Sequence, residues 1–170
     1  MANQTVTIKR NKVVYDIDLV SWKTARTRLT ENRSIAEAQT DSGSDNMFIL
    51  ERRILTALQK VKQECRWCVA STTGTSGGND DMSGVSSTGI TTTTYAITFR
   101  DAISNKITWN DVALRVHNYI VYSVLADWFS YVMPSEVQNY ATQAAAEMSD
   151  LIGLFLRDAP VYPTTTPSES

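Results

Sequence analysis

Histidine and cysteine are scarce in this chain, and their scarcity removes most side-chain catalysis and metal binding from consideration. The 170 residues include one histidine, His117, and two cysteines, Cys65 and Cys68. A structural zinc site takes four ligands, which these three residues do not supply. An acid–base mechanism that uses an imidazole has to use His117. The G-x-S-x-G pattern at residues 74–78 stands in a Ser/Thr/Gly-rich stretch, so no serine is expected at the strand-to-helix turn of a nucleophile elbow. We therefore assign no catalytic residue, metal site or cofactor, and expect a protein that is not an enzyme.

Cys65 and Cys68 form a C-x-x-C motif whose position argues against redox chemistry. A thioredoxin-like site lies at a helix N-terminus, where the helix dipole lowers the thiol pKa. Here the pair falls near the end of an amphipathic segment, at the opposite electrostatic end. The spacing places both thiols on the apolar side of that segment, so we predict buried core cysteines.

Long apolar runs are also missing, and the net charge is small. No run reaches the length of about 20 apolar residues that crosses a membrane, and the N-terminus lacks the apolar region of a signal peptide. We expect a soluble protein made in a cytosol, with no membrane partner. The net charge of -2 conceals an asymmetry, because residues 1–68 carry +4 and residues 69–170 carry -6. Such opposite ends suit head-to-tail contacts between copies, although solvated helix faces explain them equally well.

Glycine and proline are few, and they are concentrated in two segments. Residues 71–94 hold five of the seven glycines, and the end of the chain holds three of the four prolines. The glycine-rich stretch has too few apolar groups to fold alone, and it lacks the Lys-Ser/Thr signature of a phosphate-binding loop. We predict a single domain over residues 1–160 with a flexible Ser/Thr/Gly loop inserted at 71–94, and an extended Pro-rich arm over 161–170.

The remaining sequence predicts a mainly α protein. Apolar residues spaced by four and three predict an amphipathic helix over residues 46–70, with its charged side including Glu51. Two long helices follow, separated at Met133-Pro134 because proline disfavours helical geometry in the residue before it. β-Branched residues predict two short strands within 5–16, possible partners in a hairpin, and another strand over 92–100. The expected fold is a bundle of three to four helices with a small β element.

A helical composition over residues 18–40 predicts one further helix. Its sparse apolar side would consist of Val20, Trp22, Ala25 and Leu29. We expect a surface helix there, or a helix followed by a loop.

The stretch from Tyr119 to Met133 is apolar on nearly every side, whereas a helix of a small domain normally keeps a wet face. The following helix carries a coiled-coil-like seam with small alanines that let a neighbouring helix approach closely. Surplus aromatic surface is common in protein interfaces. The residues predicted for an interface are Trp128, Phe129, Tyr131, Ala141, Ala144 and Met148.

The stretch HNYIVYSVLADWFSYVMPSEVQNYATQAAAEMSDLIGLFLRD resembles the C-terminal half of small head and tail assembly proteins of phages and prophages of gut bacteria, the crAss-like group included. Tyr15–Asp18, Leu50–Cys68, Thr91–Phe99 and Tyr119–Pro134 stand where that group has its segments, and Tyr119–Trp128 is the distinctive part. The resemblance implies a virion structural protein of the neck or tail.

This resemblance implies a subunit of a head–tail connector ring that joins the portal to the tail. It also implies a homo-oligomer, twelvefold in related connectors, with the portal protein and neighbouring neck or tail proteins as partners and DNA in the channel. The protein would be assembled in the host bacterial cytoplasm and located in the virion. One alternative is a nucleic-acid-binding accessory protein, and the least favoured is a small enzyme using His117 or the cysteines. The DNA contacts of the first alternative would come from Lys23, Arg26, Arg28 and Arg33.

Overall fold

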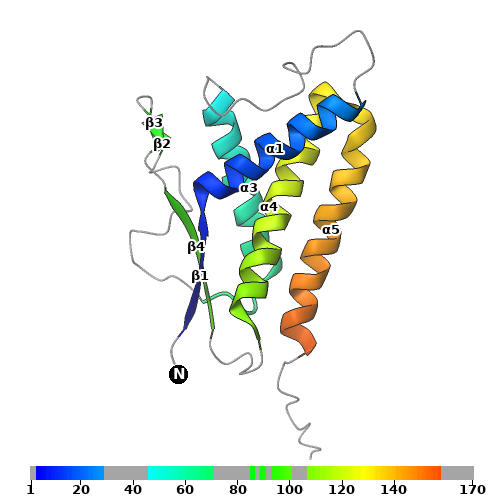
Figure 1. Cartoon of the computed structure of the whole chain (residues 1–170). Coiled ribbons are helices and arrows are strands. Elements are labelled where there is room, and N and C mark those ends of the chain that lie inside the picture. Colours follow the sequence, from blue (N-terminus) through cyan, green and yellow to red (C-terminus); the bar gives the residue numbers. More distant parts are fainter. Residues whose placement is uncertain are drawn as a thin grey trace, which may run out of the picture.

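The computed structural model describes residues 3–28, 46–70, 85–86, 89–90, 93–100 and 107–157. Four helices and four strands lie in these stretches (Figure 1). The helices are α1 (Arg10–Arg28), α3 (Asn46–Glu64), α4 (Trp109–Val132) and α5 (Pro134–Arg157). The strands are β1 (Gln4–Lys9), β2 (Val85–Ser86), β3 (Gly89–Ile90) and β4 (Thr94–Phe99). The prediction of a mainly helical bundle with a small β element is confirmed.

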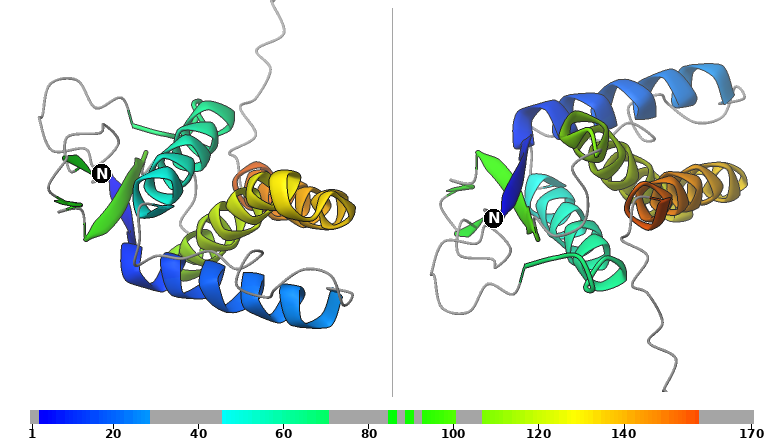
Figure 2. Two further views of the ribbon diagram at one scale, coloured as in Figure 1. Left: turned by 90° about the horizontal axis from the view of Figure 1, so that it is seen from above. Right: turned by 90° about the horizontal axis from the view of Figure 1, so that it is seen from below.

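Helix α4 lies at the centre of the bundle. Helix α5 packs beside it as an antiparallel neighbour, α3 packs on another side, and α1 crosses it (Figures 1 and 2). Strand β1 also contacts α4. Viewed from above or below, α3 and α5 flank α4 on the side away from α1 (Figure 2). A face of the central helix is therefore left between two helices that contact each other little.

The central position of α4 explains why its sequence is apolar on nearly every side. Four elements, α1, α3, α5 and β1, pack against this one helix. Much of the apolar surface that the sequence assigns to subunit contacts is thus used inside the chain, and only a part is left for other partners. The buried residues of α4 are Val112, Val116, His117, Tyr119, Ile120, Val121, Val124, Leu125 and Phe129.

The predicted separation at Met133-Pro134 is confirmed. Helix α4 ends at Val132 and α5 begins at Pro134. Met133 leaves helical geometry with φ -151° and ψ 71°, as expected for a residue that precedes proline. Its N–H still donates to the carbonyl of Phe129 at 2.8 Å, and its own carbonyl accepts from the N–H of Glu136 at 3.0 Å. A single residue therefore reverses the chain and sets α5 beside α4.

The hairpin predicted within residues 5–16 is wrong in its second half. Residues 4–9 form β1, but α1 begins at Arg10, whose N–H donates to the carbonyl of Thr93 at 3.0 Å. The antiparallel partner of β1 is β4, with Val6 opposite Ile97. Strand β4 confirms the strand predicted over 92–100, and its partner comes from about ninety positions earlier in the chain.

The buried side of helix α1 matches the predicted one only in part. Ala25 is fully buried as expected, but Val20 and Trp22 are only half-buried, and residues 29–40 of the predicted helix lie outside the described part of the chain. The buried side includes the polar residues Ser21 and Thr24, and the hydroxyl of Thr24 is hydrogen-bonded to that of Tyr140 on α5. This side consists of Val13, Val14, Ile17, Ser21, Thr24 and Ala25.

Helix α3 confirms the amphipathic helix predicted over 46–70, although it ends at Glu64 and a turn follows. Its predicted apolar stripe is buried as expected. Glu51 is a correction, because the sequence places it on the wet side and the structure buries it completely. Its Oε2 lies 2.7 Å from Nε of Arg10, and its Oε1 accepts a hydrogen bond from the Tyr95 hydroxyl at 2.7 Å. Two partners on other elements compensate the burial of the carboxylate.

Most of the loop predicted over 71–94 lies outside the described residues, as does the arm over 161–170. Within that loop the structure describes β2 and β3, which pair antiparallel with Val85 opposite Ile90. Among the described helices, none is both long enough and apolar enough to cross a membrane.

Candidate protein-interaction surface

A groove runs along the face of the bundle where α3 and α5 flank α4. Its volume is about 500 Å³. The central helix contributes Tyr119, Ser123 and Ala126, and α3 contributes Lys60 and Glu64. We call this hollow the α3–α5 groove. Its longest wall is formed by α5 with Ala141, Ala144, Ala145, Met148, Ser149 and Ile152.

Three of the residues predicted for an interface line this groove together: Ala141, Ala144 and Met148. Ala144 and Met148 are largely buried against α4, and Ala141 is half-buried. Ala145 lines the same wall and is exposed. Side chains this small leave room for the backbone of another helix to approach. Their role in a subunit interface stays a prediction, to which the structure adds a shared wall and an open hollow.

A more polar cleft adjoins the groove and shares Lys60 and Ser123 with it. We call it the basic cleft. Its volume is about 370 Å³, and its lining holds three cationic side chains, Arg52, Arg53 and Lys60, against one carboxylate, Asp127. The complete lining is Arg52, Arg53, Thr56, Ala57, Lys60, Ser123, Val124 and Asp127.

Arg53 is the central side chain of the basic cleft. Its Nε lies 2.9 Å from Oδ2 of Asp127. Its guanidinium carbon lies 5.6 Å from the ring centroid of Trp128 and 5.3 Å from that of Tyr131, within the range of cation–π attraction. Within the described part of the chain, its Nη1 is buried and has no hydrogen-bond partner. The guanidinium is therefore held by three neighbours but left unsatisfied at one nitrogen.

The other three residues predicted for an interface have different environments. Tyr131 is 74% exposed and Trp128 is half-buried, both beside Arg53. Phe129 is fully buried and stacks on Tyr140 of α5, with 5.3 Å between ring centroids. Its helix–helix contact is thus made within the chain, while Trp128 and Tyr131 keep surface that another molecule can reach.

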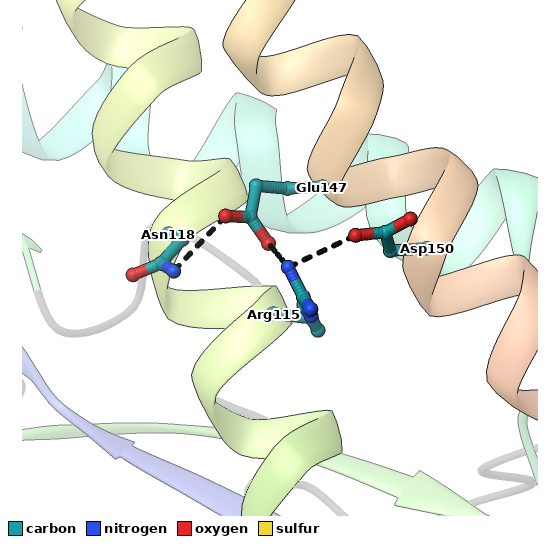
Figure 3. Close-up of polar contacts among 4 residues, drawn as sticks. All are labelled: Arg115, Asn118, Glu147 and Asp150. Carbon is teal, nitrogen blue, oxygen red and sulfur yellow. Dashed lines mark hydrogen bonds and ion pairs between the residues drawn. The ribbon is translucent and has the colours of Figure 1, made fainter.

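The wall formed by α5 is fixed to α4 by a polar cluster (Figure 3). Nη1 of Arg115 lies 2.8 Å from Oε2 of Glu147 and 3.0 Å from Oδ2 of Asp150. The side-chain amide of Asn118 donates to Oε1 of Glu147 at 3.1 Å. The hydrogen bond to Glu147 raises the pKa of Arg115, with further support from nearby carboxylates. The cluster sets the position of α5 along α4 and so helps to define the groove.

Sequence reasoning missed both this cluster and the Arg53 contacts, although signals for them exist. Arg115 and Asn118 are three residues apart on one helix, and Glu147 and Asp150 are three apart on the next, so each pair shares a face. Asp127 is the one acidic residue in the apolar stretch 119–133, which indicates a cationic partner. Which cation it meets depends on how α3 packs, which no local pattern specifies.

Cys65 and Cys68 are both free and fully buried, as predicted. The thiol of Cys68 donates to the carbonyl of Cys65 at 3.1 Å. The neighbouring Cys65 thiol and burial raise the pKa of Cys68, whereas the Cys68 thiol lowers the pKa of Cys65 against the opposing effect of burial. Among the described residues, no group of three or more His, Cys, Asp or Glu side chains is placed to hold a metal ion.

His117 lines a third cleft, of about 450 Å³, between the β1–α1 junction and the start of α4. Its Nε2 lies 2.7 Å from Oδ2 of Asp16 on α1. A carboxylate that orients an imidazole is one component of acid–base sites. The burial of the two cysteines therefore argues against the enzyme alternative, whereas the position of His117 is compatible with it. The other lining residues include Thr7, Lys9 and Lys12.

The nucleic-acid alternative depends on basic residues of α1 and the segment after it. Lys23 and Arg26 are exposed, and the guanidinium of Arg26 lies 5.2 Å from the Trp22 ring centroid. The side chain of Arg28 and all of Arg33 lie outside the described part. The described pair is a small basic patch, whereas sequence-independent DNA binding uses an extended one.

Comparison of the chain with protein-family models, with curated proteins and with solved structures found no match.

Proposed function

We propose that the protein is a structural subunit of a phage virion that packs through the α3–α5 groove against a neighbouring copy of itself. The assembly is a head–tail connector ring that joins the portal to the tail, and the subunit has no enzymatic activity of its own. The portal protein and the adjacent neck or tail proteins are its further partners, with DNA passing through the ring.

The observation that carries the packing part is the α3–α5 groove. The helices α3 and α5 flank α4 but contact each other little, so a hollow remains over α4. Another helix can pack in such a hollow, with its side-chain ridges in the grooves of the helices around it. Here one wall is rich in alanine, and half of the residues predicted for an interface line it. The virion part depends on the resemblance of the segment Tyr119–Trp128 to phage head and tail assembly proteins.

The choice of a second copy as the occupant is supported by charge. The basic cleft beside the groove presents three cationic side chains against one carboxylate, whereas residues 69–170 carry a net charge of -6. Contacts between unlike surfaces of identical copies are heterologous, and they close into a ring when the rotation between copies allows it. Opposite charges on the two surfaces favour this contact over a two-fold pairing of like surfaces.

The test compares two adjacent alanines of α5. Ala145 lines the groove, and Ala146 is also exposed but does not line it. We expect the wild-type protein to form an oligomer in size-exclusion chromatography with light scattering, alone or with portal protein. Ala145→Trp fills the groove and should shift the protein to the monomer, whereas Ala146→Trp should leave the oligomer unchanged. A wild-type monomer indifferent to every virion protein contradicts the proposal.

A further inference from the structure

We infer that the basic cleft binds the carboxylate side chains of an acidic protein segment that docks beside the α3–α5 groove. This inference deepens the proposed function and rests on it for the protein nature of the partner. It adds the chemistry of the recognised segment and the residues that recognise it.

The cationic side chains on α3 determine how long a segment the cleft can bind. Arg52, Thr56 and Lys60 line the cleft at intervals of four residues, so they form one row along the helix. With a rise of about 1.5 Å per residue, the row is roughly 12 Å long. Arg52 and Lys60 are exposed, so both charges can meet an incoming ligand. Two carboxylates of one short segment can span this distance, whether the segment is extended or helical.

Arg53 is held in position to bind a carboxylate. Asp127 and two aromatic rings hold its guanidinium in place, so little side-chain freedom is lost when a ligand binds. Its side chain is 17% exposed, and Nη1 is enclosed without a partner in the described part of the chain. A buried hydrogen-bond donor without an acceptor destabilises the protein, because it has lost its hydrogen bonds to water. A carboxylate oxygen from a partner would accept a hydrogen bond from Nη1 and remove this penalty. The exposed ring of Tyr131 is the neighbour that a partner can most easily displace.

The lining of the cleft favours a protein segment over DNA as its ligand. The cleft contributes three cations and already contains one carboxylate, and its volume of about 370 Å³ suits a few side chains. Proteins that bind duplex DNA through its phosphates present many basic groups over an extended surface. The cleft therefore favours Asp or Glu side chains.

The experiment measures binding of a dye-labelled hexaglutamate peptide to the full chain by fluorescence anisotropy at low salt. We expect Arg52→Gln and Lys60→Gln each to weaken binding about tenfold, the usual effect of losing one charged hydrogen bond. Arg53→Lys retains the charge but loses the planar donors and should weaken binding similarly. The matched control is Arg66→Gln, an exposed residue outside the cleft that changes the net charge by the same amount. Circular dichroism of each variant checks that it is folded.

Several outcomes overturn the inference. One is an absence of peptide binding by the wild type. Another is a loss of affinity in Arg66→Gln as large as that in Arg52→Gln or Lys60→Gln, and the last is an unchanged affinity in Arg53→Lys. A duplex DNA of the same charge is compared with the peptide in the same assay. If the DNA binds more tightly and its binding depends on Arg52 and Lys60, the cleft is assigned to nucleic acid instead.

The same variants separate this inference from the ring proposal. Peptide binding that depends on the cleft, in a protein that never oligomerises, supports the cleft and contradicts the ring. An oligomer that forms in the wild type, with no peptide binding by either the wild type or the monomeric Ala145→Trp variant, supports the ring and contradicts the cleft.

Discussion

Nε of Arg10 lies 2.7 Å from Oε2 of Glu51, and this contact ties the start of α1 to the second turn of α3. The other carboxylate oxygen of Glu51 accepts a hydrogen bond from Tyr95 on β4 at 2.7 Å. One buried side chain therefore connects two helices and the β element. Arg10 follows β1 directly, so the network also fixes the point where the strand becomes a helix.

Replacement of Glu51 should be strongly destabilising. Glu51→Ala leaves the Arg10 guanidinium and the Tyr95 hydroxyl without their shared acceptor in a buried site. Removing one partner of a buried ion pair typically costs about 3–5 kcal/mol. We expect the free energy of unfolding in urea to fall by about 3 kcal/mol. Glu64→Ala, an exposed position on the same helix, should change it by less than about 0.5 kcal/mol. Equal effects of the two substitutions would show that the network contributes nothing.

Stability should fall in alkali because of Tyr95. Burial, together with the hydrogen bond to Glu51, raises the pKa of Tyr95 above its ordinary value of 10.0. The folded state then keeps the phenol proton above pH 10, where the unfolded chain loses it, so the stabilisation is complete below pH 10 and declines above it. Above pH 10, this one group should lower the free energy of unfolding by about 1.4 kcal/mol per pH unit.

The measurement is the difference in unfolding free energy between the wild type and Tyr95→Phe from pH 9 to 11.5. The phenylalanine variant lacks the titrating hydroxyl, so the difference isolates the contribution of Tyr95 from that of other groups. It should be constant up to about pH 10 and then shrink. A difference that stays constant over the whole range would mean that the phenol ionises as readily in the folded protein as in the unfolded chain.

The helices that the sequence predicts well are those whose signals are local. The apolar stripe of α3 repeats at helical spacing, and Pro134 marks the boundary between α4 and α5 wherever they pack. Helix α1 gives a weaker signal because Ser21 and Thr24 occupy its buried side. The partner of β1 also escapes local reasoning, because strand pairing depends on contacts between distant residues.

The candidate surface could be predicted only in part, for the same physical reason. The alanines of α5 are visible in the sequence as a seam with small side chains, and the structure places Ala141 and Ala144 on one wall of the groove. The basic cleft forms where Arg53 on α3 meets Asp127 on α4, seventy-four positions later in the chain. Phe129 is predicted with Tyr131 from the same aromatic cluster, but it is buried while Tyr131 is exposed, because residues two positions apart on a helix point about 200° apart.

The cluster around Arg115 should contribute modestly to stability and more to the register of α5. Glu147→Gln weakens the contacts to both Arg115 and Asn118, and partly exposed pairs contribute up to about 1 kcal/mol. A double-mutant cycle of Arg115→Ala and Glu147→Ala should give a coupling energy of about 0.5–1 kcal/mol. The coupling should shrink at 1 M salt, because salt screens exposed charges. Zero coupling at low salt would mean that this cluster does not hold α5 in place.

Phe129 and Tyr131 should separate folding from assembly. Phe129 is fully buried against Tyr140, so Phe129→Ala leaves a cavity and should lower the unfolding free energy by about 3–5 kcal/mol. Tyr131 is 74% exposed and contacts Arg53 through its ring, so Tyr131→Ala should cost less than about 1 kcal/mol. Tyr131→Ala should instead weaken subunit association, measured by light scattering over a concentration series. A Tyr131 variant that assembles like the wild type would remove this residue from the interface and leave the groove wall of α5 as the surface to test.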